Sequence, residues 1–174
     1  MAELQLFAAG IPVPKGSMKA FMRPGMKHPV LTHDNLKSAP WAQSVKWEAL
    51  RVKQARSWPL AEAGEPLRID CVFYLPRPKG HYGSGAKSVI LKPSAPVHHT
   101  TKPDRDKLLR NICDALKGII YSDDSQLVSG ITDKKYADAT HPPGATITIT
   151  ILTPAQLSAH PAGATGATNP MKEK

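Results

Sequence analysis

The alternation of apolar and polar residues predicts three strands along the chain. Residues 4–9 form a short first strand, and residues 145–152 form a last strand with isoleucine at every second position. In the segment 67–75 every second residue is apolar, which is typical of a strand with one buried face. The three predicted strands, near the start, in the middle and near the end of the chain, can therefore pair in one sheet.

A longer period, of three to four residues, predicts two helices. The first begins at Ser38, which we expect to act as its N-cap, and extends to about Arg56. The second extends from about Lys107 to Lys117 and is followed by a glycine that ends it. After it, residues 118–137 hold the turn sequence SDDS between two apolar stretches, so we predict a β-hairpin there.

Two segments between these elements are rich in proline, glycine and basic residues. Residues 10–29 are too broken for a core element and are predicted to be a surface loop or arm. Residues 76–100 form a long basic loop that could close over a DNA backbone. The order of elements predicts a single small α+β domain over 1–153, a mixed β-sheet with two helices packed on it, and a disordered Ala/Gly/Pro-rich tail over 154–174.

Charge is distributed unevenly along the 174 residues, which carry a formal net charge of +9. Residues 4–33 and 71–103 contain no acidic residue, whereas six aspartates fall between residues 104 and 133. A basic surface favours a polyanionic partner such as nucleic acid, although a basic protein without such a partner has the same charge. Acidic residues gathered in one segment of a basic protein are typical of metal binding.

Cys71 and Cys113 both lie in apolar patterns without a CxxC spacing, so we expect reduced core residues in a cytoplasmic protein. The start of the chain does not resemble a signal peptide, and no apolar stretch approaches the length of a membrane span. We therefore expect no membrane partner.

Candidate chemistry is concentrated in the segment KPDRDKLLRNICDALKGIIYSDDSQ, residues 102–126. Asp104 and Asp106 would face the same side if the backbone were extended there, and Pro103 favours extension before it. Two adjacent carboxylates then require a cation between them. The alternatives are that Asp106 only caps the helix and that SDDS is only a turn, although a turn can still direct one of its aspartates toward a shared site.

The pattern KPDxDKLxRxxxDALxG followed by DDSQ resembles the RusA family of Holliday junction resolvases. The resemblance is specific over residues 102–126; over the remainder of residues 4–152 mainly the order of elements agrees. It implies a homodimeric enzyme, commonly from a phage or prophage, that makes paired cuts across a four-way junction. It also implies dependence on Mg²⁺, with Mn²⁺ as a substitute.

The resemblance assigns metal binding to three aspartates of this segment, Asp104, Asp106 and Asp124. A basic residue of the family's helix, lysine in some members, falls at Arg110. Arginine binds phosphate well but does not donate a proton at neutral pH. We predict that Arg110 and Lys135 assist catalysis together with the three aspartates, because cations stabilise the charge that develops on a phosphate under attack.

Basic residues around this segment are predicted to bind DNA phosphates. They are Lys15, Lys19, Arg23, Lys79, Lys87, Lys92, Lys102, Lys107 and Lys134. The predicted function is that of a Mg²⁺-dependent, structure-specific endodeoxyribonuclease that resolves Holliday junctions in recombination and repair. The alternatives are a non-catalytic DNA-binding protein of the same fold and a broader nuclease for flaps or forks.

Overall fold

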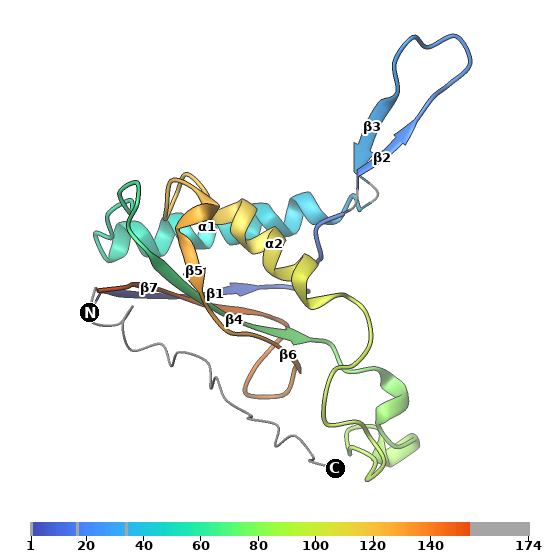
Figure 1. Cartoon of the computed structure of the whole chain (residues 1–174). Coiled ribbons are helices and arrows are strands. Elements are labelled where there is room, and N and C mark those ends of the chain that lie inside the picture. The colour runs from blue at the N-terminus through green and yellow to red at the C-terminus, as the bar shows by residue number, and fades with distance from the viewer. Residues whose placement is uncertain (1, 17, 34, 154–174) are drawn as a thin grey trace, which may run out of the picture.

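The computed structural model describes residues 2–16, 18–33 and 35–153. The tail 154–174, predicted to be disordered, lies outside the described residues. A five-stranded sheet carries two long helices (Figure 1), which confirms the predicted α+β class with a mixed sheet and two packed helices.

The sheet is antiparallel on one side and parallel on the other. Strands β1 (Glu3–Ala9), β7 (Gly144–Ile151) and β4 (Leu67–Leu75) lie in that order and pair antiparallel. Strands β5 (Leu127–Ser129) and β6 (Thr132–Tyr136) both pair with the free side of β4 in the parallel direction. The three strands predicted from alternation are thus confirmed as β1, β4 and β7.

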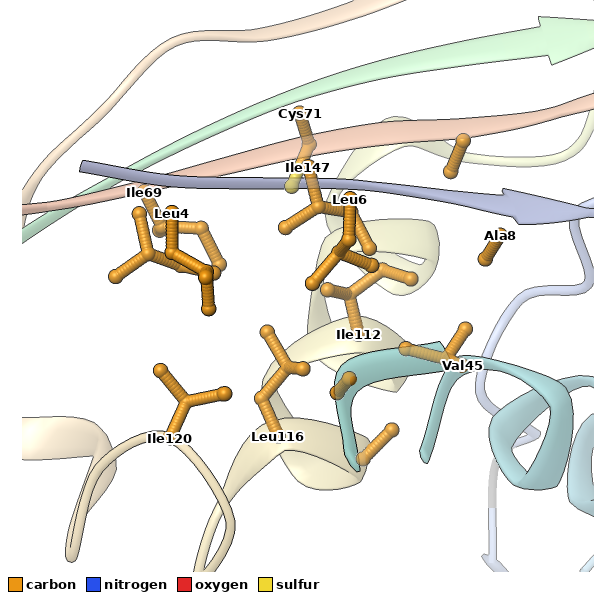
Figure 2. Close-up of a cluster of buried hydrophobic side chains, with 14 of the residues drawn as sticks. Leu4, Leu6, Ala8, Val45, Ile69, Cys71, Ile112, Leu116, Ile120 and Ile147 are labelled. Atoms are coloured by element: carbon orange, nitrogen blue, oxygen red, sulfur yellow. The ribbon is translucent and has the colours of Figure 1, made fainter. Parts of the chain in front are cut away.

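Helices α1 (Ser38–Ala55) and α2 (Arg105–Leu116) lie on one face of the sheet (Figure 1). Their apolar stripes meet the inward side chains of β1, β4 and β7, and the fully buried Val45, Leu116 and Ile147 mark this core (Figure 2). The core holds α2 firmly against the sheet. The part of α2 that carries chemistry is therefore fixed relative to β5 and β6.

Two helix starts differ from the predictions. Lys37, not Ser38, occupies the N-cap position of α1. Just before the helix, the Ser38 amide donates to the Asn35 carbonyl oxygen at 3.1 Å. Helix α2 begins at Arg105, two residues earlier than predicted. The second difference places Asp106 within the first turn of the helix.

The predicted hairpin over 118–137 is wrong. The predicted first strand, residues 118–121, forms a turn with isolated bridges at Tyr121, and the predicted second strand, residues 126–137, contains both β5 and β6, which pair with β4 in succession along the same edge. The pairing is irregular at Val128, an extra residue between Leu127 and Ser129, which pair with Leu67 and Arg68. Between the two strands lies Gly130, which has φ of +157° and approaches the Ile69 carbonyl so closely that a β-carbon would clash with its oxygen. Only glycine fits this approach. The apolar pattern predicted strands here but not their partner.

Two extensions leave the body near the start of α2 (Figure 1). Strands β2 (Met18–Phe21) and β3 (Val30–His33) pair antiparallel and form a projecting hairpin, where the sequence predicted an arm without strands. The second extension is the loop 76–100, which contains the short 3-10 helices η1 (Lys79–His81) and η2 (Gly85–Lys87). These extensions correspond to the two acid-free segments of the sequence.

Candidate active site

Asp104 and Asp106 lie on either side of the α2 start. Asp104 is extended, with φ −69° and ψ 137°, and occupies the N-cap position, whereas Asp106 belongs to the first helical turn. The two carboxylates consequently diverge, so the expectation that they face the same side is not met. Asp106 lines one pocket with Asp124, and Asp104 lines another on the opposite flank of the helix.

The two aspartates of the SDDS turn have different roles. Asp123 caps the 3-10 helix η3 (Asp124–Gln126) by accepting from the Ser125 amide at 3.0 Å, and its carboxylate pairs with the Lys117 ammonium, which lowers the pKa of Asp123. Asp124 points into the pocket that it shares with Asp106. The turn therefore uses one aspartate for its own structure and presents the other to the site.

Gln126 fixes this turn in place. Its side chain is buried, and its Oε1 accepts from the amides of Ser122 at 2.8 Å and Asp123 at 2.9 Å. Its Nε2 donates to the carbonyl oxygens of Glu62 at 2.7 Å and Glu65 at 3.2 Å. The linker before β4 is thereby joined to the turn that carries Asp124. This explains why a glutamine follows the aspartates of the sequence motif.

The pocket between α2 and the β5–β6 edge, which we call the acidic pocket, has a volume of about 440 Å³. Asp106, Arg110 and Asp124 line it with apolar neighbours. Oδ1 of Asp124 is buried and has no hydrogen-bond partner. A buried carboxylate oxygen without a donor is unfavourable unless a cation or a ligand satisfies it. The pocket thus has the donor set and the unsatisfied atom that suit a divalent cation.

Asp104 is not part of this donor set. Among residues 2–16, 18–33 and 35–153, no three histidine, cysteine, aspartate or glutamate side chains are grouped so that they could hold one metal ion. The carboxylate of Asp104 instead lies 3.4 Å from the Lys107 ammonium. The structure therefore brings two of the three predicted metal ligands together.

Cys113 also lines the acidic pocket, but its thiol is poorly suited to chemistry. Burial and the neighbouring Asp124 carboxylate raise the pKa of Cys113 to about 11. The thiolate is the nucleophilic and metal-binding form, so a thiol with this pKa is inert near neutral pH. Cys71 is buried in the core, as predicted.

Lys134 and Lys135 occupy opposite faces of β6. Lys134 is half-buried, and its ammonium donates to the carbonyl oxygens of Thr101 and Pro103, each at 2.8 Å. Lys135 is exposed on the other face. Lys134 thus holds the segment that leads into Asp104, a positioning role that the sequence did not indicate.

Several other predicted DNA-binding lysines have partners within the protein. Lys15 pairs with Asp114 at 2.8 Å, Lys107 lies beside Asp104, and the Lys92 ammonium donates to a carbonyl oxygen of its own loop at 2.8 Å. All of them remain at least partly exposed. The remaining predicted residues whose side chains are described, Arg23, Lys79, Lys87 and Lys102, are exposed. The side chain of Lys19 lies outside the described residues.

Asn111 is a structural residue of the site that the sequence analysis missed. It is buried on α2, and its Nδ2 donates to the Val13 carbonyl oxygen at 2.8 Å. Arg105 similarly donates to the Thr132 carbonyl oxygen of β6 at 3.2 Å. The signal for Asn111 is a polar residue within the apolar stripe of a helix, where an unpaired amide would be unfavourable.

The fold and the site define a class of protein. An acidic pocket beside a helix start, surrounded by basic extensions, is suited to the hydrolysis of a nucleic-acid phosphodiester. In agreement with this class, the family model described as endodeoxyribonuclease RusA matches residues 11–150. The chain belongs to the RusA family of Holliday junction resolvases, which are nucleases that act on branched DNA.

A curated relative covers much of the same region. The chain is 34% identical over 129 residues to a Bacillus subtilis (strain 168) protein described as uncharacterized protein YqaN, an alignment that spans 74% of this chain and 84% of the relative. None of the described helices is both long and apolar enough to cross a membrane.

Proposed function

We propose that this protein is a Mg²⁺-dependent endonuclease that resolves four-way DNA junctions by paired nicks, with Mn²⁺ as a substitute metal. The observation that carries the proposal is the acidic pocket, which Asp106 and Asp124 both line and in which Oδ1 of Asp124 is buried without a hydrogen-bond partner. Mg²⁺ is commonly bound by one or two carboxylates, with water and substrate phosphate oxygens as its other ligands.

Asp106 and Asp124 would hold the metal ion in this proposal. Only the resemblance to the RusA family supports Asp104 as a third ligand, so we assign the metal site to Asp106 and Asp124. When bound, the ion polarises the phosphodiester and lowers the pKa of an attacking water.

Arg110 is the basic residue that we assign to this site. Its side chain lines the acidic pocket and is exposed, so its guanidinium can bind the non-bridging oxygens of the phosphate that is cut. It neutralises charge there without giving up a proton. In the same pocket, apolar Leu109 and Leu127 reduce the access of water to the carboxylates, which strengthens their interaction with a cation.

The proposed working unit is a symmetric homodimer. A four-way junction has approximate two-fold symmetry, and its resolution requires one nick in each of two opposed strands. A closed dimer with two-fold symmetry places two identical acidic pockets in that relation. Light scattering at micromolar concentration tests the assembly, and nick mapping on a supercoiled cruciform tests whether the two cuts are made in one binding event.

The central experiment compares synthetic four-way junctions, forks, flaps and linear duplexes with and without Mg²⁺. We expect Mg²⁺-dependent cutting of the four-way junction in preference to the others. Asp106→Asn and Asp124→Asn should lower the cleavage rate by about 10³-fold or more, because metal activation contributes several kcal/mol to transition-state stabilisation. Both variants should still bind the junction in EDTA.

Asp138→Asn is the matched control, because Asp138 is exposed and the asparagine keeps the oxygen that accepts from the Thr140 and His141 amides. Binding of all branched DNA without cutting would support a non-catalytic protein and contradict the proposal. Faster cutting of flaps or forks than of junctions would contradict the assigned substrate.

A further inference from the structure

A second pocket lies on the other flank of the α2 start, and no role has been assigned to it. This basic pocket, as we call it, has a volume of about 540 Å³ and is lined by the loop 11–16, the end of β4 and residues 99–107. Residues from both acid-free segments lie beside α2 in this pocket. It is separate from the acidic pocket, because none of its lining residues lines the other.

One side of the basic pocket is positively charged. Lys15, Lys102 and Lys107 line it; Lys15 pairs with Asp114 at 2.8 Å, and Lys107 lies 3.4 Å from Asp104, which lines the same pocket. His99 also lines the pocket, but burial and the nearby Lys134 ammonium lower its pKa, so it is neutral at pH 7. The positive charge of the pocket therefore comes from its lysines. Such a group of lysines favours a phosphate.

The other side of the pocket is apolar. Ile11, Pro12, Val13, Leu75 and Pro76 contribute to it, and Ile11 has 59% of its surface exposed. Of these, Ile11 and Pro76 are exposed, whereas Pro12 and Leu75 are buried beneath them. Exposed apolar side chains beside a cationic surface suit a ligand with one flat apolar part and one anionic part. A nucleotide has both parts, and a stretch of paired duplex backbone presents only the second.

Hydrogen bonds hold one wall of the basic pocket in place. The Lys15 amide donates to the Lys107 carbonyl oxygen at 2.9 Å, and Asn111 donates to the Val13 carbonyl oxygen at 2.8 Å. Asn35 donates to the carbonyl oxygen of the intervening Pro14 at 3.0 Å. These bonds attach the apolar side of the pocket directly to α2, the helix that presents Asp106.

The distance between the two pockets is set by the chain. Asp104 lines the basic pocket and Asp106 the acidic pocket. Two residues span at most about 7 Å between their α-carbons. The pockets lie on opposite flanks of α2, and a helix with its side chains is about 10–12 Å across, so a strand cut in the acidic pocket can reach the basic pocket within a few nucleotides.

We propose that the basic pocket binds one unpaired nucleotide of the cut strand, its phosphate against Lys102 and Lys107 and its base against the wall that includes Ile11. The inference rests on the proposed function and adds a recognition step to it. A base at the crossover of a four-way junction is more easily unpaired than one in continuous duplex, because mismatched or exposed bases need less energy to leave the stack. The pocket therefore selects branched over linear DNA.

The test uses junctions that carry 2-aminopurine at successive positions around the crossover, titrated with protein in EDTA so that no strand is cut. We expect fluorescence to rise at one position in each cut strand, within a few nucleotides of the mapped nick. Ile11→Ser should reduce this rise and the affinity without changing the salt dependence of binding. Lys102→Ala should reduce the slope of log affinity against log salt by about 0.7–0.9, as one lost phosphate contact does.

Lys46→Ala is the matched control, because Lys46 lies on α1 outside the basic pocket. It should leave the fluorescence change intact. Binding and cutting of the junction with no fluorescence change at any position would overturn this inference alone. An equal effect of Lys46→Ala and Lys102→Ala would also overturn it, since the lysines would then act through general charge. A protein that binds no branched DNA would overturn the proposed function, and this inference with it.

Discussion

Replacement of Gln126 by methionine tests how the turn that carries Asp124 is held. Methionine keeps a similar length but makes none of the four hydrogen bonds of the glutamine to backbone groups. Two amides and two carbonyl oxygens, all in part-buried hydrogen bonds, lose their partner. At about 1 kcal/mol for each bond, with a partial offset from the apolar side chain, Gln126→Met should destabilise the fold by about 2–4 kcal/mol.

In a domain of this size that loss corresponds to a decrease of about 5–12 °C in Tm. Thermal unfolding followed by circular dichroism measures it, and Gln54→Met, on the exposed side of α1, is the matched control. Cleavage should fall further than the residual folded fraction explains, because Asp124 loses its fixed position. If the two variants have the same Tm, the hydrogen bonds of Gln126 do not hold the turn.

Three further predictions concern single residues around the site. Lys134→Met should slow cleavage but leave the salt dependence of junction binding unchanged, because the Lys134 ammonium binds carbonyl oxygens of the protein. If the slope of log affinity against log salt falls by about 0.9, Lys134 contacts a DNA phosphate instead. Gly130→Ala should lower the free energy of unfolding by about 2–4 kcal/mol in a denaturant titration, because the new β-carbon would clash with the Ile69 carbonyl oxygen. Gly80→Ala should have little effect in the same titration, because a β-carbon at Gly80 would lie in open space. Cys113, with its pKa raised to about 11, should react slowly with a disulfide reagent at pH 8 in the native protein and quickly in denaturant, and fast native labelling would contradict this pKa.

The sequence predicted those parts of the fold whose pattern is local. Alternation identified β1, β4 and β7, and the helical period identified both helices, because each of these elements buries one regular face. Strands β5 and β6 pair with β4, which lies some 60 residues earlier in the chain. No local sequence pattern predicts that pairing. The projecting hairpin was also missed, because prolines and glycines interrupt residues 10–29 and predict a loop there.

The site was predicted in its residues more than in its geometry. The segment 102–126 does supply the acidic pocket, with Asp106, Arg110 and Asp124 together. Asp104 lines a different pocket from Asp106, because the helix begins between them, and its role in metal binding stays a prediction. The partners of Lys15 and Lys134 lie on other elements, so their internal contacts follow only from the tertiary structure.

The exposed edge made by β5 and β6 affects the behaviour of the protein at high concentration. An unpaired strand edge can recruit a strand from another molecule and start aggregation. Here the glycine irregularity interrupts the edge after three residues, and the exposed side chains of Asp133 and Lys135 place opposite charges along the remainder. Both devices oppose the addition of a strand. The irregularity that shapes the acidic pocket should therefore also keep the protein from polymerising through its sheet.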